Sequence, residues 1–342
     1  MSAARLTFQR TDYRYAFPKS LIAAAPAEPR DASRLLVLDR RQSTLAHRTF
    51  SELPEYLDAG DCLVLNRSKV VPARLVGRKP TGGKAELLVV RGAQDGRWHV
   101  LSADLKPGGR VELADGATAV AESRTPDGGW LMRFSAADVP ALLRRCGEAP
   151  LPPYIRKRRR AAGGGAVDDL DRYQTVYARE EGSIAAPTAG LHFTPELLAR
   201  LRTQGVRIVE IILHVGLGTF LPVSADDIRE HAMLAEAFTV PAPARAAIAE
   251  TRRQGARVIA VGTTATRTLE TGGDRGETDI FIRPGHRFSA VDALLTNFHQ
   301  PESTPLLLAC AFAGRDRIMA AYREAIEREY RLFSYGDSML IL

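Results

Sequence analysis

Residues 193–220, FTPELLARLRTQGVRIVEIILHVGLGTF, decide the fold class of this chain. Thr194, Pro195 and Glu196 supply an N-cap, a first-turn proline and a first-turn acid, so a helix is predicted that ends near Gly205. The apolar run VRIVEIILHV then predicts a buried strand, which the polar GLGTF follows. A capped helix joined to a continuous apolar strand is typical of α/β proteins with a mainly parallel sheet.

The same alternation continues toward the C-terminus. A second helix is predicted over residues 243–254, ending at Gly255 and leading into the strand RVIAVG. Apolar residues near the end of the chain recur at helical spacing, which predicts a helix that lays one face on the core: Ile318, Tyr322, Ala325, Ile326 and Tyr330.

Residues 61–135 have a different pattern, one of short β-runs separated by turn residues. The runs are CLVLN, ARLVGRK, AELLVVRG, WHVL, RVELADG, TAVAES and WLMRF. Between them stand pairs that tolerate the positive φ of tight hairpins: Gly82-Gly83, Asp95-Gly96, Gly108-Gly109 and Asp127-Gly128. This spacing predicts a small antiparallel barrel or sandwich.

The composition is that of a folded chain of about two domains. Of its 342 residues, 45% are hydrophobic and 25% are charged, close to average globular usage. The net charge is +7, and five cations stand side by side at residues 156–160; without them 42 basic residues face 40 acidic ones. This run indicates a polyanionic partner. A solvated loop is the alternative, because RKRRRAAGGGAVDD is basic and then glycine-rich, which predicts a mobile loop.

The cysteines and the apolar runs indicate a cytoplasmic protein. Cys62, Cys146 and Cys310 are far apart and form no C-x-x-C pair, which fits a reducing compartment. The most apolar short stretch, residues 306–313, is well below the roughly eighteen residues needed to span a bilayer. We therefore expect neither export nor membrane association.

Four polar segments follow predicted strands or open predicted helices. They are GSIAAPTAGLHF (182–193), HVGLGTF (214–220), VGTTATR (261–267) and TNFHQPEST (296–304). In parallel α/β architectures the loops after the strand ends gather on one face, where helix N-termini present free N–H groups. These segments are the leading site candidates.

Individual residues in these segments have both functional and structural interpretations. His214 can act as a general acid or base, or as a hydrogen-bonded structural residue. Thr263, Thr264 and Arg267 can hold a ribose or a carboxylate, or the threonines can cap a helix. A metal site is a further possibility, but the H-x-x-x-x-E spacing does not place two ligands on one helix face; its members would be His192, His214, His231, His299 and Glu236. No P-loop and no strand followed by G-x-G-x-x-G is present.

Ten segments, in order along nearly the whole chain, closely resemble the S-adenosylmethionine:tRNA ribosyltransferase-isomerases, a queuosine biosynthesis family. They are RDASRLLVLDR (30–40), VVPARL (70–75), TGGK (81–84), LPPYI (151–155), RYQTVYA (172–178), AAPTAGLHFT (185–194), HVGLGTF (214–220), VGTT (261–264), TNFH (296–299) and FSYGD (333–337).

The resemblance implies a bacterial enzyme that uses S-adenosylmethionine as a ribosyl donor. It would act on 7-aminomethyl-7-deazaguanine at the wobble position of tRNA, release adenine and methionine, and leave epoxyqueuosine. The implied α/β fold is a distorted α/β barrel of residues 1–62 and 151–342, with residues 63–150 inserted as a small antiparallel β-barrel. The expected partners are S-adenosylmethionine, as co-substrate, and tRNA; no other cofactor and no metal are expected, and the protein is expected to be a monomer.

The resemblance also distributes roles. A sulfonium acidifies the neighbouring ribose C–H bonds, so the reaction needs a base, and departing adenine needs a proton donor. The candidates for these two tasks, not assigned individually, are His214, His192, His299 and Glu236. The substrate-binding candidates are Asp31, Arg34, Asn66, Lys69, Arg74, Thr188, Gly216, Gly218, Thr219, Thr263, Thr264, Arg267 and Asn297. The tRNA-binding candidates are Arg156, Lys157, Arg158, Arg159 and Arg160. For Asp31 and Arg34 a structural ion pair is the alternative.

One departure from the family pattern concerns a proton carrier. Relatives often have H-x-M-H-x-E where this chain has His231, Met233, Leu234 and Glu236, so the second histidine is a leucine. An enzyme without it would be slower, use another donor or act on a changed substrate. Two other functions stay open: an RNA-binding protein without catalysis, and a metal-dependent hydrolase built on the histidines.

Overall fold

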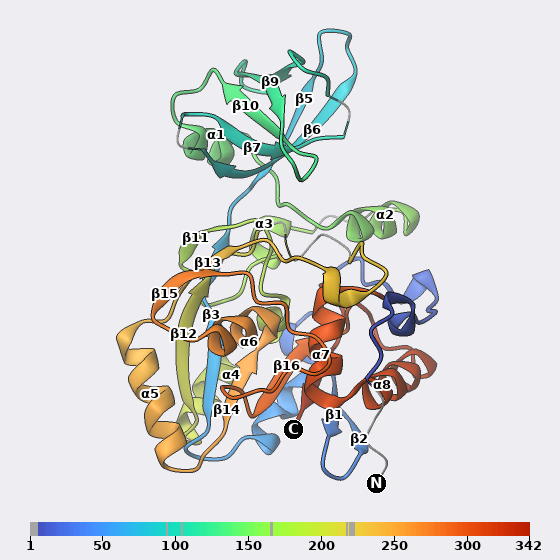
Figure 1. Ribbon diagram of the computed structural model, residues 1–342, viewed down its shortest axis with the longest axis vertical. Helices are drawn as coiled ribbons and strands as arrows, with labels where there is room; N and C mark the ends of the chain where they lie inside the picture. Colours follow the sequence, from blue (N-terminus) through green and yellow to red (C-terminus); the bar gives the residue numbers. More distant parts are fainter. Residues whose placement is uncertain (1–5, 94, 104, 165–166, 217, 219–222) are drawn as a thin grey trace.

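The computed structural model of the protein describes residues 6–93, 95–103, 105–164, 167–216, 218 and 223–342. Within these residues nine strands form one sheet (Figure 1), with the four strands β12, β3, β14 and β16 parallel to one another. In spatial order the strands are β15 (Arg275–Thr278), β13 (Glu236–Thr239), β12 (Arg207–Leu213), β3 (Cys62–Asn66), β14 (Val258–Val261), β16 (Ala293–Asn297), β17 (Ser338–Ile341), β1 (Arg34–Asp39) and β2 (Thr44–Thr49).

Helices cover both faces of this sheet, as the continuous apolar strands predict. In β3, Cys62 and Val64 pack into a cluster with residues of α5 to α8, whereas Leu63 and Leu65 pack on the other side with α4 and the 3₁₀ helix η4. The helices of this larger unit are α2 (Pro153–Ala161), α3 (Asp169–Arg172), α4 (Pro195–Thr203), α5 (Ala242–Arg253), α6 (Gly262–Thr271), α7 (Thr304–Ala313) and α8 (Arg315–Glu327). Its 3₁₀ helices are η1 (Arg10–Tyr13), η2 (Lys19–Leu21), η3 (Arg30–Ala32), η4 (Phe50–Tyr56), η5 (Thr188–His192) and η7 (Ile228–Glu230).

The helix predicted after Thr194 is confirmed. The Thr194 side chain accepts a hydrogen bond from the Leu197 N–H at 3.1 Å, and Pro195 opens α4. Gly205 follows the helix with φ +89°, a conformation that other residues rarely adopt. The next residues enter β12, so the stretch from which the fold class was inferred lies in the middle of the sheet.

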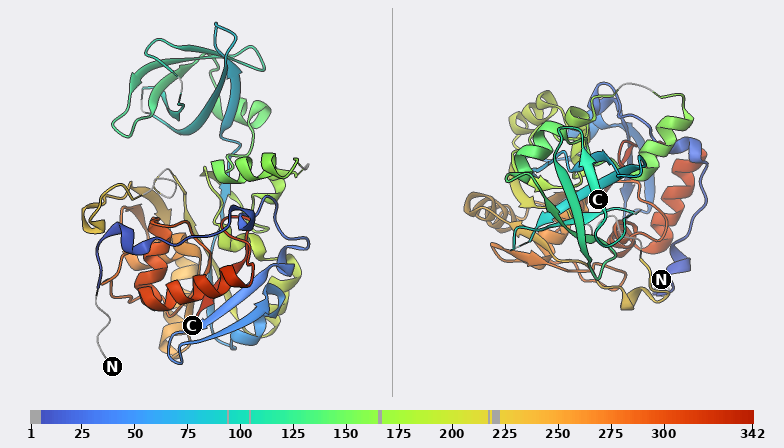
Figure 2. Two further views of the ribbon diagram at one scale, coloured as in Figure 1. Left: turned by 90° about the vertical axis from the view of Figure 1, so that its right-hand side faces the viewer. Right: turned by 90° about the horizontal axis from the view of Figure 1, so that it is seen from above.

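The inserted barrel is also confirmed. Between Arg74 and Phe134, leaving out residues 94 and 104, six strands close in the order β10-β7-β6-β5-β8-β9. The strands are β5 (Arg74–Arg78), β6 (Lys84–Gly92), β7 (Trp98–Leu101), β8 (Arg110–Leu113), β9 (Thr118–Arg124) and β10 (Trp130–Phe134), and helix α1 (Val139–Cys146) follows them. Their apolar side chains form a separate core around the fully buried Trp130. Figure 2 shows the barrel standing at one end of the molecule, above the larger unit.

The two units are joined by neighbouring segments of chain. Arg74 and Glu148 exchange two backbone hydrogen bonds, of 3.2 and 2.8 Å, so the entrance to the insertion and its exit lie side by side. Nearby, β4 (Ser68–Val70) pairs with β11 (Glu180–Ser183) in a small parallel sheet. The whole of β3 belongs to the large sheet, including the residues after the expected boundary at residue 63, because its apolar run is buried between β12 and β14. The division into two domains with those boundaries stays a prediction.

Within the described residues, no helix is both long enough and apolar enough to cross a membrane.

Candidate functional site

The strand ends of the large sheet open into one cavity of about 820 Å³, called the central cavity below. Its wall includes residues 185–189, Val215, residues 262–264 and residues 296–300, so all four predicted segments reach it. The sheet explains why: Val261 of β14 and Leu295 of β16 are register partners in a parallel pair, so the residues that follow them emerge next to each other.

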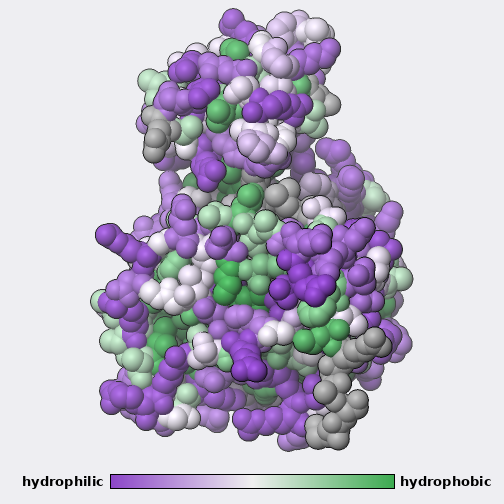
Figure 3. Space-filling view, viewed as in Figure 1, coloured by the Kyte–Doolittle hydropathy of each residue, from purple (hydrophilic) through white to green (hydrophobic). Residues whose placement is uncertain are grey.

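The barrel and α2 complete the wall of the central cavity. Residues 150–154, Arg156 and Lys157 line it from the larger unit, and Arg74, Glu86 and residues 101–103 line it from the barrel. The cavity therefore lies between the two units. The space-filling view (Figure 3) shows apolar surface gathered on the larger unit below the barrel, with hydrophilic residues around it. A partly apolar hollow with a few polar groups is the usual form of a small-molecule site.

Of the four predicted catalytic side chains, all within the described residues, only His299 lines the central cavity. Its Nε2 lies 2.7 Å from Thr296 Oγ1, its N–H donates to the Tyr322 hydroxyl at 2.9 Å, and its carbonyl accepts from the Tyr15 hydroxyl. Burial lowers the pKa of the imidazole to about 3. At neutral pH His299 is therefore uncharged, in the form that can accept a proton.

His192 lies in the core rather than in the cavity wall. It ends η5, is 4% exposed, and stacks on Phe50 with ring centroids 4.9 Å apart. Its Nδ1 lies 2.7 Å from Ser33 Oγ. Burial lowers the pKa of His192 to about 4, although Asp337 favours the charged form. A catalytic role for His192 stays a prediction.

His214 follows β12 directly and is not among the residues that line the central cavity. Val215 lines the cavity, and neighbouring residues of an extended chain point to opposite sides. The His214 imidazole lies instead against Gly182, where an added Cβ would come within 2.6 Å of Nδ1. Burial lowers the pKa of His214, opposed by the charge of Glu180. A catalytic role for His214 stays a prediction.

Glu236 and Arg267 form a buried ion pair outside the wall of the central cavity. Their side chains are 2% and 7% exposed. Glu236 Oε1 accepts a hydrogen bond from the Gly216 N–H at 2.8 Å, and Arg267 donates to the carbonyls of Thr278 and Ile280, both at 3.2 Å. The pair thus ties β13, α6 and the loop after β12 together. This pair holds three segments together, and the catalytic role of Glu236 and the substrate-binding role of Arg267 stay predictions.

The N-terminus of α6 faces the central cavity. Gly262, Thr263 and Thr264 line it, and among the described residues no side chain caps the first turn of this helix. Free N–H groups at a helix N-terminus suit an anionic group. Thr188 and Asn297 line the same cavity, and Asn297 Nδ2 is held by the Phe333 carbonyl at 3.1 Å. With Arg74 on the barrel side, the structure brings five predicted binding residues to one cavity.

Asn66 binds backbone rather than substrate. It is fully buried, and its side chain accepts from the N–H groups of Leu213 and Ser68 at 3.0 and 3.1 Å and donates to the Leu213 carbonyl at 3.0 Å. These bonds join β3 to β12. The side chain of Asn66 is thus held within the sheet, and its predicted contact with a ligand stays a prediction.

Five of the other predicted binding residues are not among those that line the central cavity: Asp31, Arg34, Lys69, Gly216 and Gly218. The Arg34 guanidinium lies 3.7 Å from the ring centre of Tyr330 and donates to the Arg328 carbonyl at 2.7 Å. The Arg34 backbone N–H donates to Asp337 at 3.0 Å, and among the described residues Arg34 forms no ion pair with Asp31, so the alternative of a structural pair between them is not seen. Lys69 pairs with Glu181 at the surface, at 3.4 Å. For the glycines of the loop after β12, Gly216 and Gly218, a binding role stays a prediction, and Thr219 lies outside the described residues.

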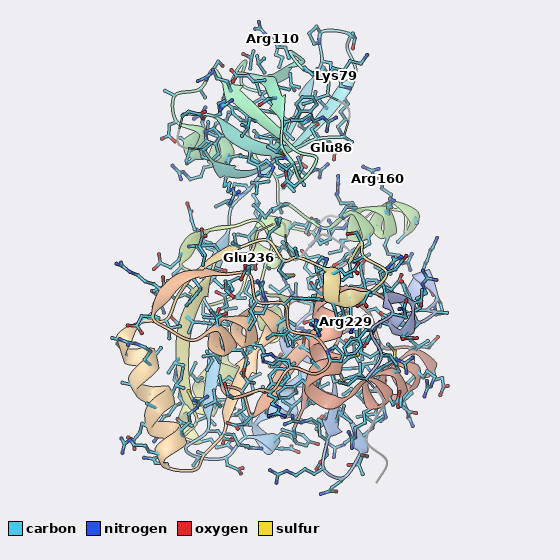
Figure 4. The ribbon with its side chains drawn as sticks, viewed as in Figure 1. Lys79, Glu86, Arg110, Arg160, Arg229 and Glu236 are labelled. Carbon is cyan, nitrogen blue, oxygen red and sulfur yellow. The ribbon has the colours of Figure 1, made fainter. Side chains whose placement is uncertain are left out.

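The five adjacent cations form part of helix α2, so the predicted mobile loop is wrong for residues 156–160. Helical spacing explains the difference: Ile155 is fully buried, and Arg159, four residues on, pairs with Asp169 at 2.9 Å. Arg158 donates to the Ser20 carbonyl. Lys157 and Arg160 are exposed. Figure 4 shows Arg160 on α2 and Glu86 at the end of the barrel nearest to it.

Arg156 reaches across to the barrel instead of solvent. It pairs with Glu86 at 2.7 Å, and Arg74 pairs with Glu86 at 2.8 Å and with Glu148 at 3.1 Å. Burial favours a raised pKa for Glu86, but the hydrogen bonds and charges of Arg156 and Arg74 lower it to about 2. Arg74 and Arg156 are therefore cavity residues held by a bridge between the units.

Sequence reasoning gave no role to several residues of the cavity wall. Tyr154, Tyr173 and Phe333 line it, and the Tyr154 hydroxyl lies 2.6 Å from Ser334 Oγ. Burial raises the pKa of Tyr154 to about 12, so it stays protonated. A signal for these residues was present, since they stand in LPPYI, RYQTVYA and FSYGD. Ser102, on a barrel loop, carries no such signal.

The histidines are not gathered into a ligand set. In the part of the chain that the structure describes, no three His, Cys, Asp or Glu side chains are placed to hold a metal ion. The position that departs from the family pattern, Leu234, is 38% exposed and lies beside Gly218, so a proton carrier there would stand next to the loop after β12.

The chain is similar to known proteins over almost its whole length. The family model described as "Queuosine biosynthesis protein" matches residues 10–341. An S-adenosylmethionine:tRNA ribosyltransferase-isomerase of Moorella thermoacetica is 52% identical, covering 97% of this chain and 99% of its own; one of Anaeromyxobacter dehalogenans is 49% identical with the same coverage. The crystal structure of S-adenosylmethionine tRNA ribosyltransferase from Thermotoga maritima matches with a TM-score of 0.56 and 39% identity, covering 97% of this chain and all of that one.

Proposed function

Because the chain belongs to the queuosine biosynthesis protein family, we propose that it is an S-adenosylmethionine:tRNA ribosyltransferase-isomerase. It transfers and isomerises the ribosyl moiety of S-adenosylmethionine onto 7-aminomethyl-7-deazaguanine at the tRNA wobble position. The products are epoxyqueuosine-tRNA, adenine and methionine. The partners are S-adenosylmethionine and tRNA, and we expect the protein to act in the cytoplasm as a monomer.

The observation that carries the proposal is the central cavity, to which all four strand-end segments contribute. Its volume of about 820 Å³ lies within the range of small-molecule sites, roughly 300–1,000 Å³. One side is formed by the ends of the parallel strands, and the other by the barrel and α2, whose Lys157 and Arg160 face solvent. This arrangement supports a small-molecule donor held in the sheet and an RNA lying across the two units.

The chemistry assigns tasks to the residues of the wall. The α6 N-terminus, with Thr263 and Thr264, is the place for the carboxylate of the methionine moiety. The sulfonium increases the acidity of the adjacent ribose C–H bonds, and we assign the uptake of a proton to His299, the only one of the four candidates that lines the cavity. Burial lowers its pKa and makes it a weak base in the free protein. The reaction needs no metal in this scheme, because the sulfonium itself supplies the positive charge.

Adenine release tests the proposal. Purified protein is incubated with S-adenosylmethionine and with tRNA that carries 7-aminomethyl-7-deazaguanine, and free adenine is quantified by chromatography. We expect one adenine per modified tRNA, none with tRNA carrying guanine at that position, and no change when a chelator is added. Tight tRNA binding without consumption of S-adenosylmethionine would reject the enzyme in favour of an RNA-binding protein.

A further inference from the structure

We propose that Tyr15 is a positioning residue that fixes His299 through its peptide backbone, so that the imidazole meets the central cavity in one orientation. This inference rests on the task proposed for His299 above. Tyr15 belongs to the segment between η1 and η2, and 284 residues separate it from His299 along the chain. No sequence motif connected the two.

Side chains hold both polar groups of the His299 backbone. The Tyr15 hydroxyl donates to the His299 carbonyl, and the His299 N–H donates to the Tyr322 hydroxyl at 2.9 Å. His299 stands two residues after β16, where these groups have no partner in the strand ladder. Thr296 Oγ1 then holds Nε2 of the ring, at 2.7 Å. Backbone and ring are thus each held by hydrogen bonds to side chains.

Tyr15 is suited to this task across a wide pH range. Its ring packs edge-on against Tyr322, with centroids 5.1 Å apart and planes at 76°, and lies 5.6 Å from the Phe17 ring. Burial raises the pKa of Tyr15, so the hydroxyl keeps its proton and remains a donor. A tyrosine that cannot ionise in the working range gives a pH-independent anchor.

The chain offers a matched control in Tyr13. This residue lies in the same N-terminal region, is fully buried, and donates its hydroxyl to a backbone carbonyl, that of Thr7, at 2.7 Å. Tyr13→Phe and Tyr15→Phe therefore each remove one part-buried hydrogen bond from a tyrosine hydroxyl to a backbone carbonyl in the same part of the fold. Only the second change frees His299.

The experiment compares these two variants in single-turnover adenine release. For Tyr15→Phe we expect the rate constant to fall about tenfold, which corresponds to about 1.4 kcal/mol, while the KM for S-adenosylmethionine stays within about twofold. For Tyr13→Phe we expect less than a twofold change. In a His299→Ala background the Tyr15→Phe substitution should have no further effect, because the anchor then has nothing to position. Equal losses in the two tyrosine variants, or a tenfold loss that persists without His299, would overturn the inference.

A spectroscopic arm separates this inference from the proposed function. In protein labelled with ¹⁵N-histidine, the signals absent from His299→Ala identify the His299 ring nitrogens, and we expect one tautomer in the wild type and a mixture in Tyr15→Phe. An unchanged ring spectrum overturns the positioning even if adenine is released; a changed spectrum in a protein that releases no adenine rejects the function alone. If Tyr15→Phe does not fold, Tyr322→Phe gives a second test, because it releases the other polar group of the His299 backbone and leaves the ring's bond to Thr296 in place; an unchanged ring spectrum in that variant also overturns the inference.

Discussion

Replacing Glu236 by glutamine should destabilise the larger unit rather than stop chemistry. The substitution removes the charge opposite Arg267 and leaves a guanidinium whose side chain is only 7% exposed. Breaking a buried pair by removing one partner costs about 3–5 kcal/mol, because the remaining charge is uncompensated. For a chain of 342 residues, the unfolding entropy near the midpoint is about 0.7 kcal/mol/K, so Tm should fall by about 4–7 °C.

The positions of the two tryptophans allow unfolding of the two units to be followed separately. Trp98 and Trp130 both lie in the barrel, so their fluorescence follows the inserted unit, whereas far-UV circular dichroism follows the helices of the larger unit. We expect urea unfolding of Glu236→Gln to show a lower midpoint in the dichroism signal. The double variant Glu236→Gln/Arg267→Met, in which no buried charge is left alone, should recover most of the loss.

A stable but inactive Glu236→Gln variant would refute the structural role. If Glu236→Gln unfolds within about 1 kcal/mol of the wild type and yet releases no adenine, the carboxylate acts in the reaction. That result would return Glu236 to the catalytic group in which the sequence placed it.

Three further predictions concern charge and burial elsewhere. Neutralising the exposed Lys157 and Arg160 together should weaken tRNA binding and reduce the slope of log K against log salt by about 1.4–1.8, with the free energy of unfolding unchanged; a constant slope in filter-binding titrations would show that these cations do not meet phosphate. His192, with its pKa lowered to about 4, takes up a proton less readily in the folded than in the unfolded state. Its contribution to the free energy of unfolding is therefore full above about pH 6.5 and falls by about 2 kcal/mol between pH 7 and pH 5, and His299 acts in the same direction. Urea unfolding of His192→Gln should show a shallower pH dependence than that of the wild type. Asn66→Ala, which strands three buried backbone groups, should cost about 3 kcal/mol and leave the KM for S-adenosylmethionine unchanged, whereas a raised KM at wild-type stability would make Asn66 a ligand residue.

Much of the fold could be predicted from local sequence patterns. The barrel follows from alternating apolar residues and from turn pairs, and Gly82, Gly96, Gly108 and Gly128 do adopt positive φ. The strand-end segments meet because a parallel sheet places all its carboxyl ends on one edge. Both inferences depend only on residues close together in the sequence and on the geometry of regular elements.

The orientation and partners of individual side chains could not be predicted from the sequence. His214 and Val215 are neighbours, and only the exact end of the strand decides which one faces the cavity. The pairing of Glu236 with Arg267 joins residues 31 positions apart, so no local pattern reveals it. Likewise, the basic run by itself predicts a solvated or RNA-binding surface. The structure shows that two of its members, Arg156 and Arg159, pair with carboxylates.

The adjacent ends of the insertion have an evolutionary consequence. Because Arg74 and Glu148 already face each other as neighbouring strands do, a short turn between them would close the chain if residues 75–147 were deleted. One recombination event at these two positions can therefore insert, remove or replace the barrel domain without changing the path of the chain in the larger unit. A protein that arose from such an exchange would keep the cavity wall formed by the large sheet. It would acquire a different wall on the side of the inserted domain, and could therefore bind a different ligand.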